Sequence, residues 1–368
     1  MTEVKDEYWE LRDAQNFNYD KDRRCYLAMT QEDVERFLKS DDVTVEYLFR
    51  ASRHVFGKTM LDSDSAEMLT IKREVARFFT LKAVKCYEEQ FIKKITAEII
   101  HTIRQKTDAI VDFHKEIAQR IPTKVILALY GIDEALDVEI FCHLDKLVRY
   151  IDNPNYPLTD ALNSKQYLTD FLFKCLQGSI KVDKNGLISC IERTLFEDEQ
   201  DLVNTLLMVL AAGMATTISA FDALLLKMYE EKDKLKYINT EKEIKDFISE
   251  SLMEDPPLHS TVRFVKTSLE YKGKELKKFD NINVNLASAN FEQVCPVTGN
   301  KSAKTTSYTF GKGKHACLGS HLAISELAIF VQEFLPFIEE FNLGQSPEDF
   351  LLTGTTIKTY SNVKLKRT

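Results

Sequence analysis

The chain has 368 residues, and its shares of hydrophobic (44%) and charged (29%) residues are those of an ordinary globular protein. A formal net charge of −8 argues against nucleic acid as a main partner, because such binding requires basic residues that neutralise phosphates. The first fifteen residues are charged throughout, so we expect no signal peptide or membrane anchor there. The seven cysteines form no CxxC pair, so we expect a reducing, cytoplasmic setting without a disulfide framework.

Helical periodicity dominates the chain. Apolar residues spaced three and four apart predict helices over 30–38, 66–79, 87–106 and 112–129, and a longer helix over 201–230. Strand-like alternation is limited to short pieces at 260–265, 281–286 and 355–365. With no linker and no internal repeat, the sequence predicts a mainly α fold with a minor β portion, in a single domain over 1–368.

The middle of the longest predicted helix carries unusually small residues. It reads from Ala211 through Gly213 to Thr217, and a glycine in mid-helix costs about 1 kcal/mol relative to alanine. A close neighbour must therefore lie against this part of the helix. The residues alone leave two candidates open, a packed helix or a ligand.

A segment near the C-terminus combines glycines with a cysteine at the start of a predicted helix. Gly311 and Gly313 permit a tight turn and a close backbone approach to a flat ligand. Cys317 stands where the helix begins, so backbone N–H groups and the positive end of the helix dipole favour a thiolate. A thiolate is a strong donor to haem iron. The alternative is a cysteine that only packs as a small buried side chain.

This segment resembles the haem-binding signature of the cytochrome P450 family, FxxGxxxCxG. Phe310, Gly313, Cys317 and Gly319 match its fixed positions, and His315 adds the family's common histidine. The resemblance implies the cytochrome P450 fold and a haem b cofactor (iron protoporphyrin IX). It implies that Cys317 is the axial iron ligand and that His315 bonds a haem propionate.

Two further segments follow in the family's order. The run from Ala212 to Thr217 resembles the helix that crosses the haem, which implies Ala212 and Gly213 over the haem and Thr216 as a catalytic residue. The run 248–265 resembles the region with the ExxR pair and a PP turn, which implies that Arg263 bonds a propionate.

Several positions depart from the family pattern. Ala215 stands in place of the acid beside Thr216, and Met253 in place of the arginine of ExxR, although Glu250 is present. Met68 and Lys72 replace the histidine and arginine expected at the propionates, which leaves Lys72 as a point charge for one of them. The loop 291–308 lacks the usual phenylalanine–proline pattern and its arginine. The sequence does not say what replaces the lost groups.

The resemblance implies a haem-thiolate monooxygenase, a cytochrome P450 oxidoreductase, that acts on a small or carrier-bound metabolite in specialised metabolism. Lys312 and Lys314 beside the cysteine predict a basic face for a ferredoxin or flavodoxin. Arg50, Arg53 and His54 form a candidate site for an acidic substrate. Two alternatives stay open. One is a peroxygenase, dehydratase or rearrangement enzyme that does not activate O2, and the other is a catalytically silent binding or recruitment protein.

Overall fold

The computed structural model describes residues 17–153, 155–291, 306–346, 349–350 and 352–368. The charged first fifteen residues therefore lie outside the described residues, as do Cys295 and most of the loop 291–308, whose departures from the family pattern are known from the sequence alone.

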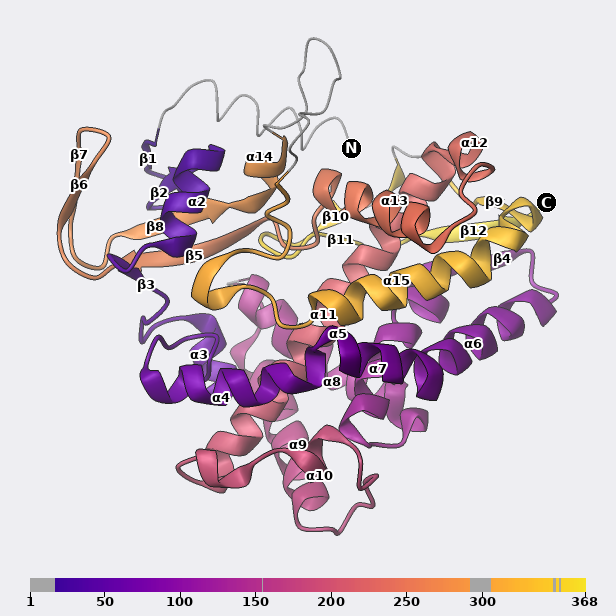
Figure 1. The fold of residues 1–368 in the computed structure, drawn as a ribbon, viewed down its shortest axis with the longest axis horizontal. Coiled ribbons are helices and arrows are strands. Elements are labelled where there is room, and N and C mark those ends of the chain that lie inside the picture. Colours follow the sequence, from indigo (N-terminus) through magenta and orange to yellow (C-terminus); the bar gives the residue numbers. More distant parts are fainter. Residues whose placement is uncertain (1–16, 154, 292–305, 347–348, 351) are drawn as a thin grey trace.

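A helical body carries a small sheet at one side (Figure 1). The five strands run in the order β1 (Tyr19–Asp20), β2 (Cys25–Ala28), β8 (Asn281–Asn285), β5 (Ser260–Val265) and β3 (Val43–Thr44). Only the β2–β8 pair is parallel. Helix α2 (Gln31–Lys39) packs on this sheet, and the apolar side chains between them form a second, smaller core. The mainly α fold with a minor β portion is confirmed.

Helix α11 (Glu199–Glu230) runs through the middle of the body. Its N-cap is Asp198, whose carboxylate accepts the N–H of Asp201, and apolar residues occupy nearly every side of the helix. It packs against α7, α8, α9, α13 and α15. Among the described residues, two helices are long and apolar enough to cross a membrane, α11 and the segment Ser320–Glu340, but 78% of the apolar window of α11 is buried inside the protein. The burial of α11 explains its apolar composition without a membrane.

The remaining long helices surround α11. They are α4 (Ala66–Ala76), α5 (Leu81–Tyr87), α6 (Lys93–Gln105), α7 (Arg120–Tyr130), α8 (Asp137–Asp152), α9 (Leu158–Leu176), α13 (Glu241–Glu254) and α15 (Ser320–Phe334). The short helix α3 (Ala51–Phe56) contacts α8, α9 and α11. These bounds agree with the predicted helices at 30–38, 66–79 and 201–230 to within two residues, since a 3₁₀ turn extends α4 to Phe79.

The helix predicted over 112–129 is confirmed except at its first residue. Asp112 ends strand β4 (Ile110–Asp112), and residues 113–118, with a π-helical turn over His114–Ala118, lead into α7. The strand forms because it pairs with β12 (Lys364–Arg367), more than two hundred residues away, and β12 also pairs with β9 (Phe341–Leu343). A local apolar pattern cannot reveal so distant a pairing partner.

Two predicted strands also end differently. The strand predicted over 355–365 is divided into β11 (Thr359–Tyr360) and β12. Strand β8 stops at Asn285, and helix α14 (Leu286–Phe291) starts directly after it. The Asn285 side chain accepts the N–H of Ser288 at 2.8 Å, so it ends the strand by supporting the first helical turn.

Candidate functional site

The cysteine segment is a tight loop that leads into α15. Gly311 and Gly313 adopt positive φ angles of 63° and 72°, which favour glycine. A Cβ on Gly313 would lie 2.6 Å from the carbonyl oxygen of Leu38 at the end of α2, so no larger residue fits there. The Cys317 N–H donates to the Phe310 carbonyl at 2.9 Å and closes the loop. Both glycines are thus required by the backbone, as the sequence predicts.

The sulfur of Cys317 lies just before the first turn of α15. Burial raises the pKa of the thiol, while the N–H groups of Gly319 and Ser320 and the charge of Lys72 lower it in part. The side chain nevertheless keeps open surface, and a Cβ on Gly319 would have no atom within 4 Å. A sulfur that is surrounded by protein yet open on one side suits a metal ion, because coordination deprotonates a thiol outright.

The middle of α11 also has open surface. Ala212 is exposed and Thr216 half-exposed, although Ala211, Met214 and Ala215 beside them are buried. The Thr216 hydroxyl donates to the Ala212 carbonyl at 3.0 Å, so its oxygen is left as a hydrogen-bond acceptor. Open surface in the middle of a core helix indicates that the protein alone does not cover this position.

Gly213 is explained by packing. A Cβ on this residue would lie 3.1 Å from Cδ1 of Ile126 on α7. Of the two candidates that the small residues leave open, a packed helix thus accounts for this glycine. A role of Gly213 toward a cofactor stays a prediction.

Arg263 on β5 is a buried cation with 4% of its surface exposed. Its guanidinium donates to the Thr261 hydroxyl at 3.2 Å and the Val262 carbonyl at 2.9 Å, and among the described residues it forms no ion pair. Burial lowers its pKa to about 10, with a further contribution from the nearby charge of Arg50. A buried guanidinium without a carboxylate partner is costly, so this site favours an anionic ligand such as a propionate.

The two other predicted propionate ligands already have protein partners. His315 Nε2 lies 2.7 Å from Asp64 Oδ1, and the Thr44 hydroxyl donates to Oδ2 of the same carboxylate at 2.6 Å. Burial raises the pKa of Asp64, but these hydrogen bonds outweigh it and lower the pKa overall. The Lys72 ammonium donates to the carbonyls of Lys314 and Ala316 in the cysteine segment, the second at 3.2 Å. Both residues therefore hold the cysteine segment in place, and propionate binding by them stays a prediction.

A neutral hydrogen-bond network lies beside Met253, which stands in place of one missing arginine. Met253 is buried on α13, and the carbonyl of its neighbour Leu252 accepts the Thr309 hydroxyl at 2.8 Å. The Thr309 oxygen accepts in turn from the Asn290 side chain at 3.1 Å and the Ser307 hydroxyl at 3.0 Å. The Asn290 carbonyl oxygen accepts the N–H of Tyr308 at 2.7 Å. Amide and hydroxyl groups thus connect α13 to the segment that leads into the cysteine loop.

Asn290 and Thr309 are functional candidates that sequence reasoning missed. Asn290 bonds residues 18 and 19 positions further along the chain, and Thr309 bonds the Leu252 carbonyl 57 positions before it. Neither position belongs to the family signature. Only the absence of arginine in this part of the chain indicates that another network must exist.

Two of the three residues predicted to bind an acidic substrate, Arg50 and His54, already bond other protein groups. Arg50 Nε lies 3.1 Å from the buried carboxylate of Asp62, and its terminal nitrogen donates to the Val45 carbonyl at 3.1 Å. His54 Nδ1 lies 2.7 Å from the Tyr150 hydroxyl on α8. These contacts fasten α3 and its flanking loop, which leaves neither side chain as an unpaired site for a substrate acid.

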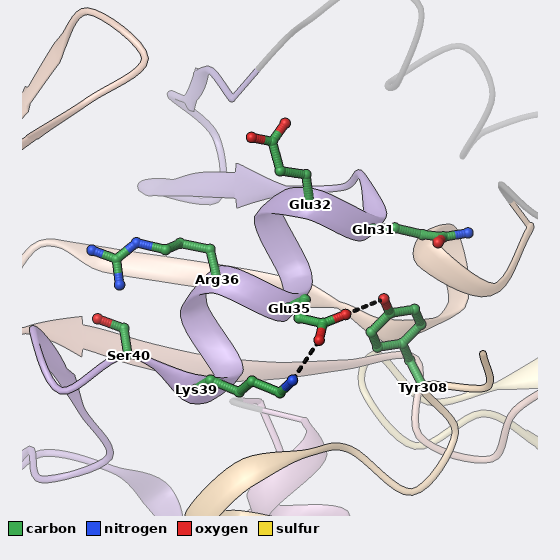
Figure 2. Close-up of a pocket in the computed structure, with 7 residues that line it drawn as sticks. All are labelled: Gln31, Glu32, Glu35, Arg36, Lys39, Ser40 and Tyr308. Carbon is green, nitrogen blue, oxygen red and sulfur yellow. Dashed lines mark hydrogen bonds and ion pairs between the residues drawn. The ribbon is translucent and has the colours of Figure 1, made fainter.

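A groove of about 590 Å³ lies along the outer face of α2 (Figure 2). In Figure 2 Glu35 lies between Lys39 and Tyr308, and it bonds them at 2.5 and 3.0 Å. The Lys39 contact, followed by those of Tyr308 and Lys312, lowers the Glu35 pKa to about 2. This groove is a surface ion-pair network whose charges are satisfied, and we assign it no catalytic role.

Comparison with known proteins finds relatives over most of the chain, although no family model matches it. The chain is 25% identical over 343 residues to cytochrome P450 109 of Bacillus spizizenii, which covers 89% of this chain and 82% of the relative. It is 24% identical over 305 residues to the cytochrome P450 monooxygenase PikC of Streptomyces venezuelae. This alignment covers 79% of this chain and 71% of the relative. It is 23% identical over 333 residues to PksS, a polyketide biosynthesis cytochrome P450 of Bacillus subtilis, which covers 88% and 78%.

Solved structures share the fold along nearly the whole chain. CalO2 superposes with a TM-score of 0.84 at 18% identity, which covers 99% of this chain and 96% of that one. P450BioI, solved in complex with an acyl carrier protein, gives 0.84 at 16% identity and covers 98% and 97%. At these identities the likeness establishes the fold alone.

Proposed function

Because the chain belongs to the cytochrome P450 family, we propose that it is a haem-thiolate monooxygenase that oxidises a small or carrier-bound metabolite in specialised biosynthesis. The observation that carries the proposal is the cysteine loop, whose two positive-φ glycines present Cys317 with one open side at the start of α15. The buried guanidinium of Arg263, which has no carboxylate partner in the part of the chain that the structure describes, supports it, since it fits an anionic cofactor.

The cofactor that we propose is haem b. Cys317 would hold its iron, Arg263 a propionate, and His315 and Lys72 would bond the propionates from the cysteine segment. Phe310, Gly313 and Gly319 would contact the ring from the cysteine side, and Ala212 and Gly213 from α11. A thiolate-ligated haem supplies the oxidising chemistry, because the thiolate favours cleavage of an O–O bond.

In this proposal, residues of α11 would hold the water that delivers protons. Thr216 donates its own hydrogen to the Ala212 carbonyl, so its oxygen is suited to accept a hydrogen bond from a water molecule. The side chain of the neighbouring Ala215 has no group that can donate a proton. Positioned proton transfer contributes about 10²–10⁴-fold to a rate, so a water chain or a substrate group must replace the missing acid.

A carrier-bound substrate is supported by one structural neighbour, P450BioI, which was solved with its acyl carrier protein. We propose a ferredoxin or flavodoxin as electron donor and a cytoplasmic setting. The positive charge of the face predicted to bind this donor is partly neutralised by acidic residues. Lys312 pairs with Glu35 at 3.3 Å, and Lys314 pairs with Asp41.

The second candidate is a haem-thiolate enzyme that uses peroxide or catalyses a dehydration or rearrangement. The observation in its favour is the buried Ala215, since a pathway that does not activate O2 needs no acid beside Thr216. The two candidates require different co-reactants.

Turnover with defined co-reactants separates them. Purified protein loaded with haem is supplied with NADPH and a surrogate ferredoxin chain, or with hydrogen peroxide alone, across a panel of hydrophobic acids, amides and macrolactones. Substrate-dependent NADPH consumption with formation of an oxygenated product supports the monooxygenase. Turnover with peroxide alone, at equal or higher rate, contradicts it and supports the second candidate.

A further inference from the structure

A second cavity, of about 380 Å³, lies between α9 and the first turns of α11. Six residues line it, and five of them carry a hydrogen-bonding side chain. They are Leu162, Lys165, Gln166, Thr169, Gln200 and Asn204. None of them belongs to the cysteine loop or to the propionate side of the proposed haem site.

The lining contains buried polar groups that the protein leaves unsatisfied or accessible. Thr169 is 7% exposed, and its hydroxyl has no hydrogen-bond partner among the described residues. Asn204 is 8% exposed, and its carbonyl oxygen accepts from Gln200 at 3.0 Å. A buried hydroxyl without a partner costs free energy, so its retention beside a cavity indicates a ligand that supplies the missing hydrogen bond.

Lys165 adds an ammonium group at the edge of the cavity. Its ammonium donates to the His54 carbonyl on α3 at 3.1 Å, and partial burial lowers its pKa. A lysine ammonium has three donors, so two remain for a ligand oxygen.

The charges around the cavity favour an uncharged ligand. Asp201 follows Gln200 directly, and Asp170 accepts from Gln166 at 2.8 Å. Burial raises the pKa of Asp201, and the neighbouring carboxylates of Asp198 and Glu197 raise it further, so acidic groups gather at this end of α11. A free carboxylate there would meet like charges. Amide and hydroxyl groups match a lining of amides, one hydroxyl and one ammonium.

The helix α11 sets the distance between the cavity and the proposed site of oxidation. Asn204, Met208 and Ala212 follow one another at intervals of four residues along α11, so they form a row on one side of the helix. Eight residues at 1.5 Å per residue place Asn204 about 12 Å along the axis from Ala212.

We propose that this cavity binds an uncharged amide or hydroxyl group of the substrate, while a carbon about 12 Å away is oxidised beside Ala212 and Thr216. The inference rests on the proposed monooxygenase function and names the substrate class. The amide comes either from the substrate itself or from the pantetheine arm of a carrier.

The test uses the Soret shift to measure dissociation constants for alkyl compounds that have the same chain length and differ in their terminal group. The probes are dodecanamide, dodecanol, dodecane, dodecanoate and S-dodecanoyl pantetheine. We expect the amide and the alcohol to bind about 5–10-fold more tightly than dodecane and dodecanoate, as one or two hydrogen bonds provide. Tighter binding of the pantetheine thioester than of dodecanamide identifies a carrier arm as the source, and the reverse order identifies a free substrate.

Thr169→Val and Asn204→Leu should each reduce the preference for the amide to about twofold or less, because each removes one hydrogen-bonding group. Thr102→Val, on the exposed face of α6, is the matched control and should leave the preference unchanged. Equal dissociation constants for all chain ends, tight binding of dodecanoate, or an unchanged preference in Thr169→Val overturns the inference. A normal carbon monoxide spectrum in the same samples shows that the haem site is intact, so this failure is distinct from failure of the proposed function.

Discussion

The two sides of the proposed haem site are built in different ways. On the cysteine side, Lys72, the His315–Asp64 pair and the Thr309 network each bond the loop or the segment that leads into it. On the α11 side, the exposed Ala212 is flanked by the buried apolar residues Ala211, Met214 and Ala215, and Thr216 contributes a hydroxyl. In the proposed haem enzyme, several independent contacts would therefore hold the cysteine side, whereas proton delivery would depend on the Thr216 hydroxyl and on a water or substrate group.

The acids of α11 sharpen this contrast. Between Asp201 and Glu230 the helix contains one acid, Asp222, and it lies 2.7 Å from His114 in a buried pair. That charge fastens α11 to the turn before α7, six residues beyond Thr216. The helix thus uses its acid for structure and has an alanine at the position that the family uses for proton transfer.

The largest effect is expected at Gly313. Gly313→Ala places a Cβ 2.6 Å from the Leu38 carbonyl at a positive φ, which should lower the free energy of unfolding by about 2–5 kcal/mol. Gly273→Ala is the matched control, because its φ is 71° and no atom lies within 4 Å. It should cost only about 1–2 kcal/mol. Equal costs in urea unfolding would show that the contact with α2 does not hold the cysteine loop.

The next effect concerns the neutral network. Asn290→Ala removes the amide that joins Thr309 and the Tyr308 N–H, so we expect a loss of about 1–3 kcal/mol in stability and faster loss of haem to apomyoglobin. Asn163→Ala, at an exposed position on α9, should change stability by less than about 0.5 kcal/mol. A stable Asn290→Ala variant that retains haem normally would contradict the role of the network.

A pH-dependent effect is expected at the His114–Asp222 pair. Burial raises the Asp222 pKa from 3.8 to about 6, and the partner carboxylate raises the pKa of His114 although burial opposes it. Since both folded-state pKa values are raised, the stabilisation is complete below pH 3.8 and declines as the pH rises through 6 and above 6.5. Urea unfolding of the native protein, relative to Asp222→Asn, should show this decline. A difference that is flat or that increases with pH would exclude it.

The smallest effect is expected on the α11 side. Ala215→Glu restores the family's acid, but the position is buried, and burial would raise the carboxyl pKa. We predict a modest change in product formed per NADPH, well below the 10²–10⁴-fold that positioned proton transfer can provide. Ala215→Gln, similar in size and uncharged, is the control. A gain of full magnitude with glutamate alone would show that proton delivery was limited only by this residue.

Local patterns in the sequence predicted much of the fold and the cysteine side. The helices that bury one apolar face, such as α2 and α4, and the glycines of the cysteine loop follow from short-range spacing. Strand β4 could not be predicted, because it depends on pairing with β12 at the other end of the chain. The network of Asn290 and Thr309 was missed for the same physical reason, since it forms only when distant segments are brought together. The partners of Arg50 and His54, which occupy a predicted substrate site, are likewise tertiary contacts.

The most direct test of the central claim is a carbon monoxide difference spectrum of the reduced protein after reconstitution with hemin, recorded beside Cys317→Ser. We predict a long-wavelength Soret band in the native protein, as a cysteine thiolate gives, and its complete absence in the variant. A native protein that takes up no haem, or a band that survives replacement of Cys317, would contradict the account.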